Sequence, residues 1–401
     1  MKKCPICRSK NILFFYEKKN FSYFTYPLKD TSKKTIKEKF SKKIFKNLKF
    51  KLCNICGHIF LSTLPNEKIL DILYKKYYLY FSAKKQKKFS ITLRENLFMT
   101  ELEKLRLNNK NTLEIGCNDG YLLNLLNKKK YKVTGVEPGS SANMAKKNGI
   151  KVYKEYFSPN LFKKRNENFD IIICRHLIEH IKKCDNFIVN LKKILSNDGI
   201  IALELPNVEH YVKKSSSETF FLQHYHYFST YSVKKLFSQN GMKVFKIVNF
   251  SGDMVVFAKR DKKNVNIIAA NKWKKEAKNF NKNIKLKNQN IKKFLFKNMK
   301  NKKKILCWGA GGYLYQLFNS FPFMKNFVSY IVDTDKSKWG LSFIDNNIKI
   351  VSPNSINLID YKLIIISSSM FIDSIEKELL IRKFKGRIAS INPKTFVKNI
   401  S

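Results

Sequence analysis

The chain has 401 residues, 44% of them hydrophobic and 27% charged, and a formal net charge of +49. This length predicts two or three domains with enough apolar residues for packed cores. No stretch approaches the about 18 consecutive apolar residues that a membrane span needs, and the first residues, MKKCPIC, lack the apolar segment of a signal peptide. We therefore expect a cytoplasmic protein without a membrane span.

The charge arises from 79 lysines and arginines against 30 acidic residues. Such a balance can indicate a nucleic acid or an anionic membrane surface as the partner. However, few of these residues are arginine, the side chain that suits bidentate phosphate contacts, and the lysines are spread along the whole chain. We expect them mainly on solvated surfaces, which disfavours a nucleic acid partner.

Two pairs of cysteines mark the N-terminal region. Cys4 and Cys7 lie in CPIC, and Cys53 and Cys56 lie in CNICGH. Each C-x-x-C turn can present two thiolates to one tetrahedral zinc ion, and two such turns complete a closed structural site. A disulfide is disfavoured in a reducing cytosol. The sequence therefore predicts a zinc-binding module over residues 1–63.

Residues 64–99 are expected to form a helical and aromatic connector. Apolar residues at helical spacing are followed by the run YKKYYLYFS at 74–82. Tyrosines at this density are usually half-buried in amphipathic packing, but they could also line the mouth of a substrate cleft. The local sequence leaves both interpretations open.

The stretch NTLEIGCNDGYLL, residues 111–123, predicts a strand, a tight turn with Gly116 and Gly120, and a helix. Glycine lets the backbone approach a ligand closely, and the free N–H groups of a helix start favour a polar or anionic ligand. The next predicted strand, YKVTGVE, ends at Glu137, where an acid can accept hydrogen bonds from ribose hydroxyls.

The acids around this turn distinguish between two classes of ligand. A dinucleotide site would show G-x-G-x-x-G, whereas here Glu114 precedes the turn and Asp119 lies inside it. These acids would repel a pyrophosphate but suit a cationic ligand with an amino group and a sulfonium, S-adenosylmethionine (SAM). The stretch resembles motif I of class I methyltransferases. The expected cofactor-binding residues are Glu114, Gly116, Asn118, Gly120, Glu137, Pro138 and His176.

Residues 100–261 alternate between predicted strands and helices, which indicates an α/β domain with a parallel, doubly wound sheet. Ligands of such sheets bind beyond the carboxyl ends of the strands. Polar residues follow the fourth and fifth predicted strands, in RHLIEHI and LELPNVEH. We expect Asn207, in the second of these segments, to contact the substrate.

Five of the six histidines fall between residues 176 and 226. Histidine is the commonest general base. His176 and His180 superficially resemble H-E-x-x-H, but Glu179 is adjacent to the second histidine rather than the first, which disfavours a catalytic zinc. In FLQHYHYFS, residues 221–229, aromatic neighbours would desolvate His224 and keep it neutral. We expect His224 to be a base and His226 to be a core residue.

The last third of the chain predicts a connecting amphipathic helix over 262–302 and a second α/β domain over 303–401. The turn in KKILCWGAGGYLYQLF carries Gly309, Gly311 and Gly312 without an acid, which suits a phosphate. Leu314 replaces the last glycine of G-x-G-x-x-G. A weak anion site and a degenerate Rossmann-like scaffold both remain open.

The order of these parts resembles the bacterial nucleotide-sugar C-methyltransferases, which act on dTDP-linked 4-keto deoxysugars. The paired C-x-x-C, LEIGCNDGYLL, FDIIICRHLIEHI and VDTDKSKWG carry the resemblance. It implies a class I methyltransferase (Rossmann-like) core with an N-terminal zinc module and a second C-terminal Rossmann-like domain. It also implies SAM, a structural zinc ion and a nucleotide-sugar substrate; the chain could be a monomer or a homodimer.

The resemblance also assigns residues to the reaction. Family members carry E-H-x-x-Y-F, whose histidine is the proposed base, and here Gln replaces Glu. The matching residues are Gln223, His224, Tyr227 and Phe228. The family's Y-x-Y-x-S matches Tyr78, Tyr80 and Ser82, so that Tyr80 or Tyr78, with Gln223, could face the substrate carbonyl oxygen. Tyr227, Asn207, Gly309 and Gly311 are the expected substrate-binding residues.

Three other functions fit the same SAM site. An O-methyltransferase of a surface-glycan sugar needs only a hydroxyl and a base, and it would tolerate Gln223. An RNA methyltransferase with a zinc-ribbon arm fits the charge, although no aromatic RNA-binding motif supports it. A non-catalytic SAM-binding scaffold is the third.

Overall fold

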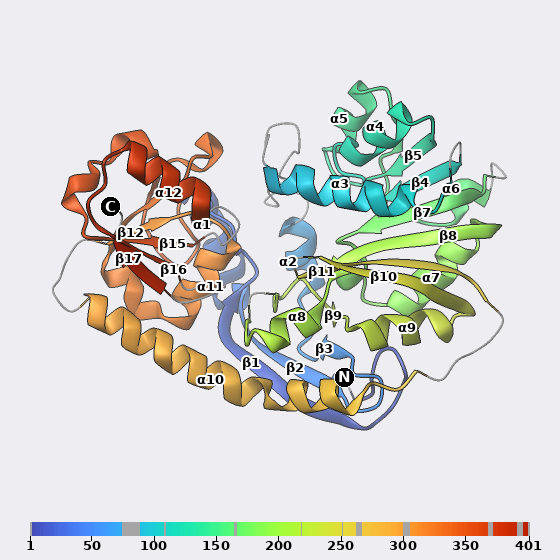
Figure 1. The fold of residues 1–401 in the computed structure, drawn as a ribbon, viewed down its shortest axis with the longest axis horizontal. Coiled ribbons are helices and arrows are strands. Elements are labelled where there is room, and N and C mark those ends of the chain that lie inside the picture. Colours follow the sequence, from blue (N-terminus) through green and yellow to red (C-terminus); the bar gives the residue numbers. More distant parts are fainter. Residues whose placement is uncertain are drawn as a thin grey trace.

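The computed structural model describes residues 2–73, 89–107, 110–163, 167–217, 219–250, 252–261, 267–299, 305–367, 372–390 and 396–399. Within these ranges, no helix combines the length and the apolar character needed to cross a membrane. The central and C-terminal sheets, each flanked by helices, lie at opposite ends of the long axis of the molecule. Helix α10 (Asn271–Met299) runs along the lower side of the N-terminal strands (Figure 1).

The N-terminal region forms a small antiparallel sheet whose last strand comes from the central region of the chain. Its order is β1-β2-β3-β9. In the two-residue strand β9, Tyr227 pairs with Ile59 and His226 pairs with Phe60. The expected module over 1–63 is therefore completed by two residues of the histidine segment (residues 217–229). The strands are β1 (Ile12–Ser22), β2 (Phe45–Cys53), β3 (Ile59–Leu61) and β9 (His226–Tyr227).

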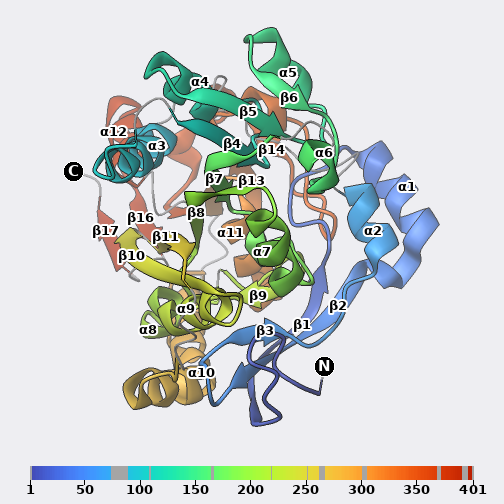
Figure 2. The same ribbon diagram turned by 90° about the vertical axis from the view of Figure 1, so that its right-hand side faces the viewer.

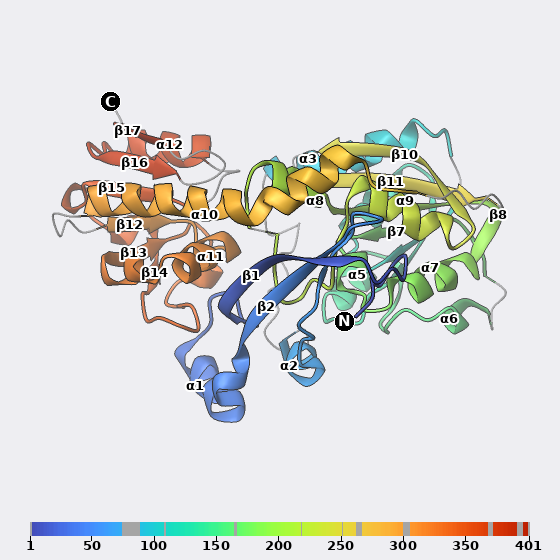
Figure 3. The same cartoon turned by 90° about the horizontal axis from the view of Figure 1, so that it is seen from below.

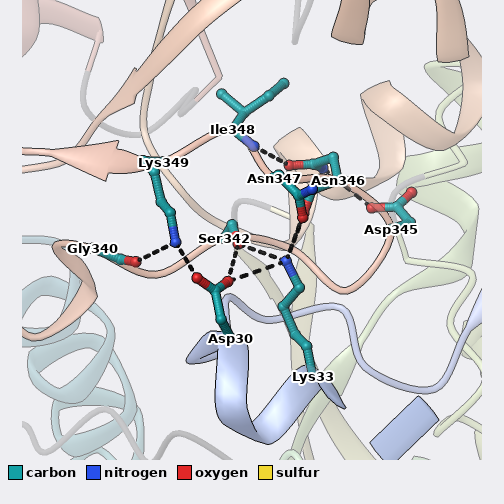
Figure 4. A network of polar contacts seen from close by, with 9 residues as sticks. All are labelled: Asp30, Lys33, Gly340, Ser342, Asp345, Asn346, Asn347, Ile348 and Lys349. Atoms are coloured by element: carbon teal, nitrogen blue, oxygen red, sulfur yellow. Dashed lines mark hydrogen bonds and ion pairs between the residues drawn. The ribbon is translucent and has the colours of Figure 1, made fainter.

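Helix α1 (Asp30–Phe40) joins this region to the C-terminal domain (Figure 4). The buried Lys33 amine donates to Ser342 Oγ and to the Asn346 carbonyl, both at 2.8 Å. Asp30 pairs with Lys349 beside them. Burial lowers the pKa of Lys33, and Asp30 opposes this effect. These contacts fix the N-terminal region against the far domain.

Two described helices lie in and beyond the expected connector: α2 (Glu67–Ile72) and α3 (Phe89–Glu103). Helix α3 crosses the expected boundary at residue 99, because Phe98 and Leu102 pack into the core of the central domain. Tyr78 and Tyr80 lie outside the described residues, so their expected roles stay predictions.

The central sheet has the order β10-β11-β8-β7-β4-β5-β6. Strands β4 to β8 are parallel, β11 is antiparallel to β8, and β10 is antiparallel to β11. This confirms the expected doubly wound α/β fold of class I methyltransferases. The strands are β4 (Asn111–Ile115), β5 (Lys132–Val136), β6 (Lys151–Tyr153), β7 (Phe169–Arg175), β8 (Leu195–Pro206), β10 (Met242–Phe250) and β11 (Asp253–Arg260).

Helices cover both faces of this sheet (Figure 2). Helices α3, α4 and α5 contribute to the core on one face, and α7 and α9 contribute to the core on the other. The helices are α4 (Tyr121–Lys128), α5 (Ala142–Lys147), α6 (Asn160–Lys163), α7 (Cys184–Lys192), α8 (Val208–Lys213) and α9 (Thr230–Ser238).

Helix α10 buries the apolar stripe that the sequence predicts, although it begins at Asn271 rather than at residue 262. Trp273, Phe280 and Leu295 are all buried, and the Phe280 ring stacks on Phe15 of β1 with centroids 4.8 Å apart. Its apolar face belongs to one core that also includes N-terminal and C-terminal residues. The helix therefore packs across the domains (Figure 3).

The C-terminal sheet has the order β14-β13-β12-β15-β16-β17 and is parallel except for β17. Its strands are β12 (Ile305–Trp308), β13 (Val328–Val332), β14 (Ile350–Val351), β15 (Leu363–Ile366), β16 (Arg387–Ser390) and β17 (Phe396–Asn399). Its α-helices are α11 (Gly312–Ser320) and α12 (Ile372–Ile381). Short 3-10 helices of the chain lie at Ser41–Ile44, Ile178–His180, Pro322–Asn326, Lys336–Lys338, Pro353–Ser355 and Leu358–Asp360.

Gly57 offers a test of the packing between the N-terminal turn and α10. Its φ is +68°, and an added Cβ would lie 2.4 Å from Trp273 Nε1. Gly149 has a similar φ of +78°, but no described atom lies within 4 Å of its added Cβ. Gly149→Ala should therefore cost only the backbone strain, about 1 kcal/mol. Gly57→Ala should lower the unfolding free energy by about 3 kcal/mol, because overpacking is added. Urea denaturation of both variants measures this, and equal losses would contradict the packing described.

Candidate active site

The turn after β4 has the backbone shape that the sequence predicts. Gly116, Asn118 and Gly120 all have positive φ, at +77°, +51° and +75°. An added Cβ on Gly120 would lie 2.9 Å from the Ala145 side chain. Glycine is therefore required at this position both by the left-handed conformation and by the packing of α4 against α5.

Glu137, at the end of β5, ties the two strand ends together. Its buried carboxylate accepts hydrogen bonds from the backbone N–H groups of Gly139 at 2.7 Å and Asn118 at 3.2 Å. These bonds orient the carboxylate at the carboxyl edge of the sheet, which is the position expected for a ribose contact.

A cavity of about 490 Å³ opens beyond the carboxyl ends of β4, β5 and β7. Four of the expected cofactor residues line it: Gly116, Glu137, Pro138 and His176. Glu114, Asn118 and Gly120 are absent from its described lining and instead lie within or beneath the turn. The sequence did not indicate the apolar part of the wall. That part includes Tyr156, Phe157, Leu177 and Phe187. The adjacent aromatic residues Tyr156 and Phe157, which follow β6, were the sequence signal that could have indicated this wall.

Glu114 belongs to a cluster of buried charges under the cavity. Arg175 contacts Glu95 and Glu204, each at 2.5 Å. Burial raises the pKa of Glu114 to about 8, although Arg175 opposes the shift. We conclude that Glu114 supports the turn from below, because it is buried beside these charges and does not line the cavity.

Two histidines, His176 and His180, line this cavity, and a third, His224, packs against His180. His176 Nδ1 lies 3.5 Å from Glu179, and its Nε2 lies 3.5 Å from Glu204. His180 lines the cavity and places Nδ1 3.1 Å from the Gln223 carbonyl. The His180 and His224 rings are perpendicular, with centroids 4.6 Å apart. Burial lowers the pKa of His224, as the aromatic sequence around it predicted, and His224 itself is partly exposed.

Three other expected site residues use their side chains within the fold. The buried Gln223 donates from Nε2 to the Tyr23 carbonyl at 2.8 Å, so it holds the N-terminal region rather than facing His224. Asn207 caps α8 by accepting from the Glu209 N–H at 3.0 Å. The Tyr227 hydroxyl donates to the Phe221 carbonyl at 2.7 Å. Their side chains therefore position backbone around the site.

His226 is a core residue, as expected. It is 1% exposed, with Nε2 3.1 Å from the Ile181 carbonyl and Nδ1 3.1 Å from His58 Nε2. Because the carbonyl can only accept, Nε2 of His226 carries a proton. Its position between these two partners leaves it no part in the cavity.

The four N-terminal cysteines meet as the spacing predicts. The sulfur atoms of Cys4 and Cys56 are 3.7 Å apart, and those of Cys7 and Cys53 are 3.4 Å apart. All four lie within 4.8 Å of one another. Ligands about 2.3 Å from a tetrahedral zinc ion would be about 3.8 Å apart, so the donor set fits zinc. In the described chain, all eight cysteines are free of disulfides.

The glycine turn of the C-terminal domain faces the histidine segment. Asp333 accepts from the Ala310 N–H at 2.8 Å and from the Lys338 amine at 2.9 Å, which closes the side of the turn. An added Cβ on Gly312 would meet only Phe221, at 3.8 Å, among the described residues. The Phe221 ring lies 5.5 Å from the His224 ring. One aromatic side chain therefore connects this turn to His224.

Comparison with known proteins assigns the central region. A family model described as a methyltransferase domain matches residues 85–247. Residues 85–247 form a SAM-dependent methyltransferase domain. This accounts for the turn after β4 and the adjacent cavity at the carboxyl edge of the sheet. A second family model, described as C2185-like, N-terminal, matches residues 301–387.

Two curated relatives match part of the chain. C-methyltransferase NovU of Streptomyces niveus is 26% identical over 153 residues, 36% of each chain. A ubiquinone biosynthesis O-methyltransferase of Pelagibacter ubique is 31% identical over 107 residues, 25% of this chain and 44% of the relative. The chain thus spans less than half the length of these relatives. Magnesium protoporphyrin IX methyltransferase of Synechocystis with bound SAH is 14% identical, with a TM-score of 0.36 over 49% of this chain and 100% of that one.

Glu137 provides a test of the SAM site. We expect Glu137→Gln to weaken SAM binding about 10- to 100-fold, because a hydrogen bond to a charged group contributes about 1.5–3 kcal/mol. Glu155→Gln is the control, since Glu155 is an exposed acid after β6. Isothermal titration calorimetry gives both affinities. An unchanged affinity in Glu137→Gln would exclude a ribose contact at this carboxylate.

Proposed function

We propose that the protein is a SAM-dependent C-methyltransferase acting on a nucleotide-linked 4-keto deoxysugar, with dTDP as the expected nucleotide. One observation carries the proposal. His180 lines the cavity of the methyltransferase domain and packs against His224, and Phe221 connects His224 to the glycine turn of the C-terminal domain. A substrate with a reactive ring at one end and a diphosphate at the other matches this sequence of groups.

The reaction depends on one acidic C–H bond. Such a bond is acidic enough for a protein base only beside a carbonyl, because the electron pair then spreads onto the oxygen. His224 accepts the proton as general base, and the electron pair passes to the carbonyl oxygen to form an enolate. When bound, SAM supplies an electrophilic methyl group: a C–C bond forms as the C–S bond breaks. Tyr78 or Tyr80 is the proposed donor to the enolate oxygen.

The nucleotide end is assigned to the C-terminal domain. Helix α11 begins at Gly312 with its N-terminal N–H groups beside the turn, and such groups favour phosphate oxygens. The added Cβ of Gly311 would have no described atom within 4 Å, so the backbone there has room for a ligand. Gly309 and Gly311 are therefore the proposed phosphate contacts.

The partial relatives support two chemistries. NovU is a C-methyltransferase, and the ubiquinone biosynthesis enzymes are O-methyltransferases. O-methylation of a sugar hydroxyl is the second candidate, favoured by the absence of the family's glutamate at Gln223. C-methylation remains our proposal because two histidines and a buried carboxylate lie together beside the cavity, which suits the removal of a proton from carbon.

The proposal is tested with SAM and dTDP-4-keto-6-deoxyglucose in deuterium oxide. We expect a new methyl group on carbon, or deuterium at the position α to the ketone, detected by mass spectrometry and NMR. His224→Gln should lower the exchange rate by at least about 100-fold, the contribution of a general base. His210→Gln is the matched control, because His210 on α8 is outside the histidine cluster. SAM binding without exchange or carbon methylation would favour O-methylation of another sugar.

We further propose that the four cysteines bind one structural zinc ion. In each C-x-x-C turn the residue after the second cysteine has positive φ, Arg8 at +61° and Gly57 at +68°. The two turns that present the sulfur atoms are therefore similar in backbone shape. Zinc would be held by thiolates and would stabilise the sheet that β9 completes.

The proposed zinc site makes two predictions, one about the zinc content of the protein and one about its thermal stability. Mass spectrometric metal analysis of the full chain should find one zinc ion per chain, and Cys7→Ser should lose most of it. Cys184→Ser should keep it, because Cys184 is buried in the central domain. Removal of zinc with a chelator should lower the midpoint of thermal unfolding. A wild-type protein without zinc, or one unaffected by the chelator, would contradict the proposal.

A further inference from the structure

Glu179 is a buried acid that the mechanism has not used. It lies in the 3-10 helix Ile178–His180, is 1% exposed, and follows β7 at the carboxyl edge of the sheet. Within the described residues, neither of its carboxylate oxygens accepts a hydrogen bond. An ionised carboxylate with so few donors is costly to bury, so a positive charge that forms beside it is strongly stabilised.

Three histidines face this carboxylate at short range in the described chain. Its oxygen and a ring nitrogen each from His180 and His224 lie within 4.8 Å of one another, and His176 Nδ1 lies 3.5 Å away. The backbone is fixed as well, because the Tyr225 N–H donates to the Glu179 carbonyl at 2.8 Å. The histidine segment and the acid therefore keep a constant separation.

We infer that Glu179 is the positioning acid of the base: it stabilises the positive charge that His224 acquires when it takes the proton from the substrate carbon. The inference rests on the proposed function. It also explains how the site can work with Gln at position 223. The acid that the family places beside the base in sequence is replaced by one from the neighbouring loop, and Gln223 is turned toward Tyr23.

The proton balance of the step is simple. The substrate C–H bond breaks, its proton binds a ring nitrogen of His224, and its electron pair moves to the carbonyl oxygen. His224 Nδ1 is buried and has no hydrogen-bond partner among the described residues, and a ring nitrogen of His224 lies within 4.8 Å of the acid. The imidazolium then forms beside a carboxylate that is already in place, which lowers the barrier without reorganisation.

The pKa directions agree with this arrangement. Burial opposes ionisation of Glu179, but His176, His180 and His224 together lower its pKa. For His224, burial lowers the pKa, His180 and His176 also lower it, and Glu179 raises it. Tyr227 faces the same carboxylate from β9, and Glu204 and Asp253 face His176 from β8 and β11. Removal of the Glu179 charge should therefore make His224 a weaker base.

The test compares three forms of the full-length protein by α-deuterium exchange across pH. In the pH–rate profile of exchange, the rate should fall on the acidic side as His224 becomes protonated and should reach a plateau above its pKa. Glu179→Gln should lower the plateau rate about 10- to 100-fold. It should also move the acidic limb of the profile down by about one to two pH units, because a charge within about 5 Å changes a pKa by that much. Glu179→Asp should keep the wild-type limb. Glu101→Gln should change neither, because Glu101 is a buried acid of α3 paired with Lys104 and Lys246.

Each outcome separates the inference from the proposed function. If the wild type shows neither exchange nor carbon methylation, the proposed function fails. If it does exchange but Glu179→Gln keeps the wild-type rate and limb, the inference is overturned. A lower rate with an unmoved limb and weaker SAM binding would reduce Glu179 to a structural role and overturn it too. So would a second metal ion lost in Glu179→Gln. ¹⁵N NMR titration of the histidines checks the pKa difference without any substrate; an unchanged His224 would refute the inference.

Discussion

The pairing of β9 with β3 is the constraint on which the site depends. Two residues of the histidine segment, His226 and Tyr227, form the edge of the N-terminal sheet. The same segment is held from a second side by the buried Lys18 of β1, whose amine donates to the Ser217 and Phe220 carbonyls at 2.7 and 3.0 Å. His224 lies between these two attachments. The proposed base is therefore positioned by the N-terminal region, although its sequence lies within the central domain.

This arrangement gives the cysteine cluster a part in the site without any contact to a substrate. Cys53 ends β2, and Cys56 lies three positions before Ile59, the first residue of β3. Gly57 then contacts α10 through the Trp273 N–H, which donates to its carbonyl at 3.0 Å. A metal ion that fixes these turns would also fix the strand that β9 pairs with. Misplacement of a catalytic group by about 1 Å can lower a rate about 100-fold, so remote stability and catalysis are coupled here.

The sequence alone predicted those parts of the site that depend on short, local patterns. A C-x-x-C turn, a glycine turn after a strand and an acid at the end of the next strand are short patterns with fixed geometry, and the cysteine cluster, the turn at Gly116 and the cavity position of Glu137 follow from them. Strand β10 was not predicted, because the two lysines of MKVFKIVNF interrupt its apolar residues without a strict alternation and the strand is largely half-buried at the sheet edge. Strand β9 has two residues, too few for any periodicity.

Long-range partners explain the remaining differences. Gln223 was assigned from its neighbour His224, but its amide is satisfied by a carbonyl about 200 positions away along the chain. Asn207 follows a strand, as binding residues do, yet its side chain caps the next helix. The partner of Gln223 cannot be inferred from the local sequence, whereas the cap at Asn207 is made to an N–H only two residues on. Glu179 is the opposite case. Its spacing in the sequence related it only to a zinc motif, whereas the fold places it beside His224.

The distribution of charge separates the two buried acid clusters. Glu204 and Glu95 share one permanent cation, Arg175, and Glu204 also lies 3.5 Å from His176 Nε2. Among the described residues, Glu179 lies beside three histidines, whose charge depends on the protons that they carry. A permanent cation makes a carboxylate structural, because nothing in the reaction alters the pair. A titratable partner changes its charge during the reaction, and the carboxylate stabilises that partner most when it has taken up a proton. The difference between the two clusters thus supports the proposal of proton transfer beside Glu179 rather than beside Arg175.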